Sequence, residues 1–239
     1  MPNVSVFIDG QNLYKGVSKL FRTRVHPILL AHELAGDRTL QEVTYYSGVH
    51  LPRENPKVHA MSMRRHKLIR RTGVKVVERS LRYHWEWGIE DRVPNPMKAD
   101  DGETHEVTVG RRRQAREKGI DLALGLDAVE AALTRRCDKV IIVSRDRDLT
   151  EVAREVHERC AVCNVSVEVA IPVSDKYRHI MEGYDYTHFV DSEMVERIRD
   201  DFDYFQKVPS KKANAFLAGL PDWEHAPTVS TGDAAAVEG

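Results

Sequence analysis

The amino-acid sequence predicts an α/β fold in which helices sandwich a mainly parallel sheet. Short apolar runs rich in β-branched residues alternate with longer segments that carry apolar residues at helical spacing. Repeated alternation of this kind is typical of parallel strands that are covered on both faces. The chain has 239 residues, which is enough to bury one α/β core but not two full domains. We therefore expect a single domain.

In chain order, the run 4–8 is bounded by Asp-Gly and predicts a buried strand, followed by a helix over 12–20. A helix over 27–35, a strand over 42–49, a helix over 55–72 and a strand over 74–80 continue the alternation. The next helix is expected over 117–135. It is expected to pack through Leu122, Leu126, Val129 and Leu133. It precedes the apolar run 139–143, which predicts another buried strand.

The last third of the chain repeats this pattern. Helical spacing continues over 148–158, and a strand is expected over 165–171. We then expect a short helix near 175–182, a strand near 187–190 and a helix over 192–204. Residues 1–205 form the predicted domain. Residues 206–239 lack hydrophobic periodicity and form a predicted flexible C-terminal tail.

Acidic residues follow two of the predicted strands. Asp9 ends the first strand, and Asp146 and Asp148 come shortly after the strand at 139–143. Ligands of open parallel sheets bind at the carboxyl ends of the strands, so these acids are placed for chemistry. Asp121 lies in the first turn of the helix that precedes the second strand. Two alternatives remain open, an Asp-Gly turn at Asp9 and helix caps at the other acids.

In their order, these segments resemble the NYN domain family of PIN-like ribonucleases, in its LabA-like branch. The similar motifs are Phe7-Ile8-Asp9-Gly10-x-Asn12, Lys118-Gly119-Ile120-Asp121 and Ser144-x-Asp146-x-Asp148-Leu149. The resemblance spans residues 4–200 and implies a PIN-like fold and a catalytic metal site. By that resemblance the metal ligands are Asp9, Asp121, Asp146 and Asp148, with Asn12 and Ser144 beside them. Arg145 and Arg147 depart from the family pattern, which usually has small residues there.

The chemistry of such a site can be stated from its donors. Phosphodiester hydrolysis needs a nucleophilic water and relief of charge on the phosphate, and a divalent metal supplies both. Mg²⁺ and Mn²⁺ prefer oxygen ligands, and clustered carboxylates repel one another without a cation. We therefore expect Mg²⁺ or Mn²⁺ as cofactor and a metal-dependent ribonuclease that hydrolyses RNA.

Two other functions are compatible with parts of the sequence. The first is a catalytically silent RNA-binding or regulatory module, in which Arg145 and Arg147 neutralise the acids. The second is a phosphatase of the haloacid dehalogenase kind. That class needs a second acid two residues after Asp9, where Gln11 stands.

Positive charge is concentrated in two parts of a chain whose formal net charge is only −1. The basic residues of the segment 64–71 are read equally well as a solvated helix face or as phosphate contacts. The second basic part is the segment 111–118, which stands at the rim of the proposed site, and this position favours contact with a polyanion. The RNA-binding residues that we predict are Arg111, Arg112, Arg113, Arg116, Lys118, Arg145 and Arg147.

Residues 81–116 have no clear assignment beyond a short strand over 105–109. They contain Tyr83, Trp85 and Trp87, which would either stack on unpaired bases or pack on the sheet edge. A long connection inside a compact domain is usually functional or disordered.

Composition favours a cytoplasmic protein without a membrane partner. Hydrophobic residues make up 41% of the chain, and no apolar run approaches the ~18 residues of a membrane span. No secretory signal is recognised, and three cysteines fit a reducing compartment. Cys160 and Cys163 are read as incidental thiols, with zinc or redox chemistry as the alternative. Single-stranded or structured RNA is the expected partner, and a homo-oligomer is compatible with the sequence.

Overall fold

The computed structural model describes residues 1–89, 109–159, 164–174, 178–204 and 218–219. Its centre is a six-stranded sheet in the order β3-β2-β1-β6-β7-β8, and every neighbouring pair is parallel. The strands are β1 (Asn3–Asp9), β2 (Thr39–Val49), β3 (Lys75–Ser80), β6 (Lys139–Val143), β7 (Ser166–Pro172) and β8 (Tyr186–Val190). The predicted mainly parallel sheet is confirmed.

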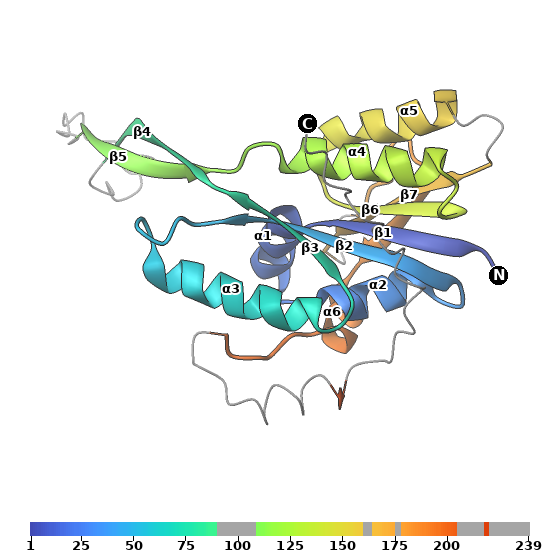
Figure 1. Cartoon of the computed structure of the whole chain (residues 1–239), viewed down its shortest axis with the longest axis horizontal. Coiled ribbons are helices and arrows are strands. Elements are labelled where there is room, and N and C mark those ends of the chain that lie inside the picture. The colour runs from blue at the N-terminus through green and yellow to red at the C-terminus, as the bar shows by residue number, and fades with distance from the viewer. Residues whose placement is uncertain (90–108, 160–163, 175–177, 205–217, 220–239) are drawn as a thin grey trace, which may run out of the picture.

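Helices cover both faces of this sheet (Figure 1). One face carries α1 (Gly10–Phe21), α2 (Pro27–Ala35), α3 (Pro56–Arg70) and α6 (Ser192–Arg197). The other face carries α4 (Ile120–Leu133) and α5 (Thr150–Arg159), and the 3-10 turn η2 (Arg147–Leu149) leads into α5. Two hydrophobic clusters form as a result. One contains Val6 and Ile8 with α1 and α2, and the other contains Phe7 with α4 and α5.

The buried face of α4 differs from the prediction. The exposed fractions of Leu122, Leu126 and Leu133 are 66%, 62% and 41%, so this leucine stripe faces outward. The helix instead packs through Ile120, Leu124 and a row of small residues, Ala128, Ala131 and Ala132. Small side chains let a helix pack closely on a sheet. A pattern based on hydrophobicity favours leucine over alanine, so it predicts the wrong buried face for this helix.

Two predicted helices also need correction. Residues 178–182 of the expected helix 175–182 are not helical, and residues 175–177 lie outside the described part of the chain. The helix expected over 192–204 ends at Arg197. There Arg199 forms a β-bridge with Val25, and the Asp200 amide donates to the Arg24 carbonyl at 2.8 Å. These long-range backbone bonds replace the next turn of helix.

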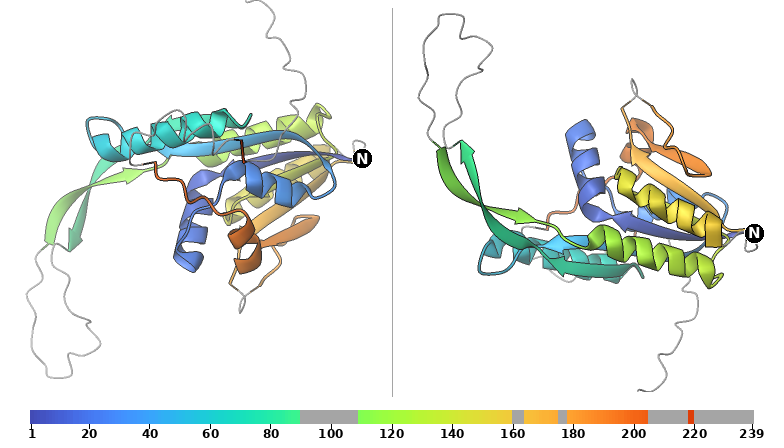
Figure 2. Two further views of the ribbon diagram at one scale, coloured as in Figure 1. Left: turned by 90° about the horizontal axis from the view of Figure 1, so that it is seen from below. Right: turned by 90° about the horizontal axis from the view of Figure 1, so that it is seen from above.

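Residues 82–89 and 109–116 form a hairpin in a segment for which the sequence predicted only a short strand over 105–109. Strands β4 (Arg82–Ile89) and β5 (Val109–Arg116) pair in antiparallel fashion and form a separate two-stranded sheet. This hairpin projects from the body of the domain at the end opposite the N-terminus (Figure 2). Most of the strand expected over 105–109 falls outside the described residues, as do Cys160, Cys163 and nearly all of the predicted tail. The boundary at 205/206 therefore stays a prediction.

Candidate active site

The strand order of the sheet reverses between β1 and β6, which lie side by side. From β1 the chain adds β2 and β3 on one side, and β6, β7 and β8 lie on the other side. The register pairs Ile8 with Val143, so the residues that follow, Asp9 and Ser144, leave neighbouring strands at the same edge. A crevice at such a switch point is the usual ligand site of an open parallel sheet.

Asp9 is held rigidly at this edge. Its side chain is only 4% exposed and accepts hydrogen bonds from the Gln11 amide at 3.1 Å, the Asn12 amide at 2.9 Å and the Ser144 hydroxyl at 3.2 Å. It therefore caps α1 as well as facing the site. Burial raises the pKa of Asp9 despite these donors, and the nearby Asp121 raises it further.

Asn12 and Ser144 join the two loops that carry the acids. The Ser144 hydroxyl accepts from the Asp146 amide at 3.1 Å while it donates to Asp9. The Asn12 side-chain oxygen accepts from the Arg145 amide at 3.1 Å. These contacts of the Asn12 side-chain oxygen and the Ser144 hydroxyl fix the loop after β6 against the start of α1.

Asp121, Asp146 and Asp148 extend the acidic edge beyond Asp9. Burial raises the pKa of Asp121, and then Asp146 and Asp148 raise it further, so all three carboxylates act on the same region. Asp146 also caps the turn η2, because its Oδ1 accepts from the Asp148 amide at 3.0 Å. The alternative that these acids are helix caps is correct for Asp146. Asp121 is not the N-cap of α4, which is Gly119, although its carboxylate accepts a hydrogen bond from its own backbone amide.

The structure adds a fifth carboxylate, Glu117, that the sequence analysis missed. Burial raises the pKa of Glu117 to about 7, with Asp9 and then Asp121 adding to the effect. Its Oε2 atom is buried, and a hydrogen bond from the backbone of Gly48 lowers the pKa only in part. The carboxylate lies against the backbone of Gly48, where any Cβ would overlap Oε2. Glu117 stands directly before the Lys118-Gly119-Ile120-Asp121 motif, and that adjacency was the available signal.

The donor chemistry of this edge fits a hard divalent cation. Asp9, Glu117 and Asp121 offer only oxygen atoms, and the pKa of each is raised first by burial and then by neighbouring carboxylates. The geometry is not that of a finished site. Within the described residues, no group of three or more His, Cys, Asp or Glu side chains stands close enough together to hold a metal ion. The predicted set of four ligands therefore remains a prediction.

Comparison with known proteins identifies the family. Residues 3–178 match the NYN domain family. The chain belongs to the NYN domain family. The crystal structure of a protein of unknown function from Vibrio parahaemolyticus is similar at a TM-score of 0.51 and 16% identity, over 83% of this chain and 96% of that one. That likeness supports the fold alone, a PIN-like α/β domain. No curated protein matches the chain.

None of the described helices is both long and apolar enough to cross a bilayer.

Two arginines stand inside the acidic loop of this NYN domain. Arg145 and Arg147 are both exposed. Across the described ranges, neither forms an ion pair with Asp146, Asp148 or another acid. The idea that they neutralise the acids therefore has no contact behind it, and their charges remain open to a phosphate. Lys118, at the other side of the site, is exposed as well.

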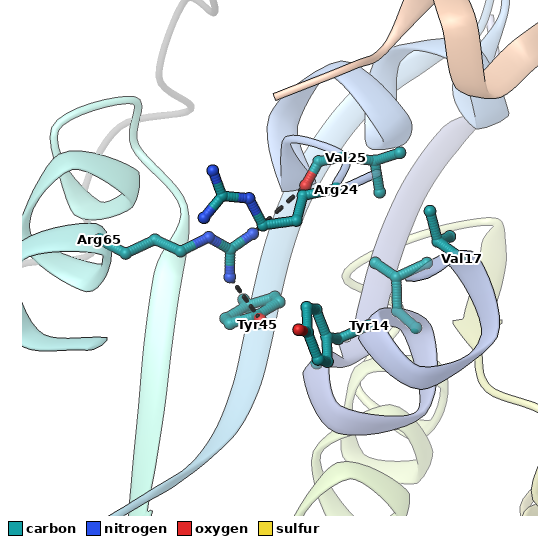
Figure 3. A pocket seen from close by; sticks show the side chains of 8 residues that line it. Tyr14, Val17, Arg24, Val25, Tyr45 and Arg65 are labelled. Carbon is teal, nitrogen blue, oxygen red and sulfur yellow. Dashed lines mark hydrogen bonds between the residues drawn. The ribbon is translucent and has the colours of Figure 1, made fainter. Parts of the chain in front are cut away.

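The basic helix α3 of the NYN domain has a structural role. Arg65 donates to the Tyr45 hydroxyl at 2.8 Å and to the Val25 carbonyl at 3.2 Å, and it stands over the Tyr45 ring (Figure 3). Arg64 donates to the Tyr204 carbonyl at 2.7 Å, and Arg70 pairs with Glu78 at 2.8 Å. These contacts bind the helix to its own domain. They favour the reading in which α3 does not contact phosphate.

Proposed function

We propose that this NYN domain is a metal-dependent ribonuclease of the LabA-like branch that hydrolyses RNA phosphodiester bonds. One observation carries the proposal: at the switch point between β1 and β6, burial raises the pKa of Glu117 and of Asp9, and the charge of Asp121 raises both further. Carboxylates kept together at a cost to the folded state are typical of sites that bind a cation. RNA is the proposed substrate and the cytoplasm the proposed location.

The residues divide the reaction between them. Asp9, Asp121, Asp146 and Asp148 would hold Mg²⁺ or Mn²⁺, which when bound supplies charge relief at the phosphate and acidifies a water. In the hydrolysis a water oxygen would form a bond to phosphorus, and the bond from phosphorus to the leaving ribose oxygen would break. Glu117, whose pKa is raised by burial and neighbouring charges to about 7, would accept the proton of that water. That proton, or one from solvent, passes to the leaving oxygen.

Other residues position this chemistry. Asn12 and Ser144 keep the acidic loop against α1 through their hydrogen bonds to Arg145 and Asp9. Exposed Arg145, Arg147 and Lys118 would attract the phosphates that flank the scissile bond. Removing Asn12 or Ser144 would therefore misplace the carboxylates and leave the charge of the site unchanged.

A second function is favoured by one observation. The described carboxylates do not form a ready metal site, which is the arrangement expected of a silent NYN module that binds RNA or regulates a partner. Such a module would bind RNA with the same arginines and cleave nothing in any metal.

Cleavage assays separate the two functions. We expect RNA, incubated with Mg²⁺ or Mn²⁺, to be cut by the parent and spared in chelator. Asp9→Asn and Asp146→Asn should abolish cleavage, whereas Asp37→Asn, at an exposed site before β2, should retain it. Parallel incubation with single-stranded DNA defines the substrate. Cleavage that survives both site variants would reveal a contaminating nuclease, and binding without cleavage in every metal would establish the silent module.

A further inference from the structure

The two faces of the β4-β5 hairpin carry different chemistry. Directly opposed residues of an antiparallel pair lie on the same face, and successive residues alternate between faces. The register pairs Tyr83 with Ala115, Trp85 with Arg113 and Trp87 with Arg111. We call this the aromatic face. The opposite face carries Arg82, His84, Glu86, Arg112, Gln114 and Arg116.

The outer half of the aromatic face is open to solvent. Trp85 is 63% exposed and Trp87 is 67% exposed, so neither ring packs on the sheet edge. The Arg111 guanidinium stands 4.9 Å from the centre of the Trp87 ring, and no ion pair holds it among the described residues. A pair of large exposed rings beside an uncompensated cation is unusual on a free surface.

The root of the same face is fixed to the domain. The Tyr83 hydroxyl lies 2.6 Å from His50 Nδ1, in a hydrogen bond to the end of β2. Arg113 pairs with Glu54 at 2.8 Å and stands over the Tyr83 ring at 5.5 Å. These contacts anchor the hairpin to the loop between β2 and α3. They give the outer half of the aromatic face a defined position relative to the body.

The opposite face is also cationic but presents no large aromatic ring. Glu86 accepts from His84 Nε2 at 2.7 Å and also pairs with Arg116. The difference between the faces therefore lies in the exposed rings, because both faces have cations but only one presents aromatic surface. The two strands together hold five arginines and one glutamate, which makes the hairpin complementary to a polyanion.

The hairpin is continuous with the acidic edge. Strand β5 ends at Arg116, and the next residue is Glu117 of the candidate active site. Glu117 lies six positions after Arg111, a distance of ~20 Å in an extended chain. A strand of nucleic acid that lies along β5 can thus reach the carboxylates while its bases contact the tryptophans.

We propose that the aromatic face of the β4-β5 hairpin binds the unpaired bases of single-stranded RNA, through stacking on Trp85 and Trp87 and phosphate contact at Arg111. This inference rests on the proposed ribonuclease function and names the form of its substrate. Bases of a duplex are stacked on each other and cannot stack on these rings, whereas every unpaired base has a free π-face. The hairpin therefore selects unpaired RNA and does not read its sequence.

Binding in chelator tests the proposal without any cleavage. The probes are a labelled oligouridine and an RNA duplex of equal length, followed by fluorescence anisotropy. We expect the double variant Trp85→Ala/Trp87→Ala to bind oligouridine at least ~20-fold more weakly, since one stacked base contributes roughly 5- to 150-fold. Binding of the duplex should change little. Trp85→Phe/Trp87→Phe keeps aromatic rings and strand propensity and should restore most of the affinity.

A charge-matched pair supplies the control. Arg111→Ala and Arg112→Ala each remove one cation from the same strand, but from opposite faces. We expect the Arg111 variant to weaken oligouridine binding more, and to reduce the dependence of log Kd on log salt by ~0.7. The tryptophan variants should leave that salt dependence unchanged.

Four results would overturn the proposal. The first is an unchanged oligouridine affinity in the double alanine variant, and the second is an affinity of the double phenylalanine variant as low as that of the double alanine variant. The third is an equal loss of affinity for oligouridine and for the duplex in the double alanine variant. The fourth is that the double alanine variant loses self-association and keeps its RNA affinity. The last would make the face an interface between copies of this chain. Failure of the ribonuclease proposal is separate, since it would appear as tryptophan-dependent binding of oligouridine without cleavage in any metal.

Discussion

Replacing Glu117 with glutamine should raise the thermal stability of the protein in chelator at neutral pH. In the folded state, burial and the charges of Asp9 and Asp121 raise the pKa of Glu117 from 4.5 to about 7. The folded protein thus holds a proton that the unfolded chain releases, and stability falls as the pH rises through this range. Glutamine keeps the shape of the side chain and removes the charge.

The magnitude follows from the change in pKa. A change of one in pKa corresponds to about 1.4 kcal/mol, which sets a ceiling of roughly 3 kcal/mol for Glu117. The side chain is partly exposed, so solvent screening reduces the expected gain to about 1–2 kcal/mol. For a domain of this size, that gain raises Tm by about 2–8 °C.

Thermal melts in chelator between pH 4 and pH 8 measure this effect. The advantage of Glu117→Gln should be complete above pH ~7 and should vanish below pH ~4.5, where the parent's glutamate is protonated in both states. Glu182→Gln, at an exposed position, is the matched control and should leave Tm unchanged. If Glu117→Gln melts at or below the parent at pH 7 to 8, Glu117 does not carry the repulsion and the electrostatic reasoning for the site is wrong.

Three other changes test the site and its support. Added Mn²⁺ should raise the parent's Tm because the ion binds the folded state, and Asp121→Asn should shrink that gain; an equal gain in both would remove Asp121 from the ligand set. Gly10→Ala should lose about 1–3 kcal/mol in urea unfolding, because the new Cβ overlaps the Tyr45 ring; an unchanged midpoint would contradict the tight contact. Burial opposes ionisation of Glu168, but hydrogen bonds from His188, Lys139 and Arg38 prevail and hold its pKa at about 2. The stabilising effect of ionised Glu168 is present above pH ~4.5 and is lost as the pH falls toward ~2. In acid titration, Glu168→Gln should therefore unfold at a higher pH than the parent. An unchanged unfolding pH would show that the ion pairs of Glu168 do not stabilise the fold.

Much of the fold was predictable because its strands are buried on both faces. The run 139–143 matches β6 residue for residue, and the run 4–8 lies within β1. A continuous apolar run has few alternatives to a central strand. The order of acids along the chain likewise singled out Asp9 and Asp121, and the charge of Asp121 raises the pKa of Asp9.

Tertiary structure decided the features that depend on distant parts of the chain. The rotation of α4, which exposes Leu122 and buries Ala128, is set by close packing on the sheet and cannot be read from hydrophobicity. The end of α6 is set by backbone bonds to residues 24 and 25, far away in sequence.

The same holds for the function-bearing details. Sequence alone determined that acids follow two strands of the sheet, because that placement follows from local patterns. Only the structure showed that these two strands are neighbours, that Glu117 lies over Gly48, and that Trp87 and Arg111 meet across a hairpin. These facts depend on which segments pair and in which register, and both are fixed by packing in three dimensions.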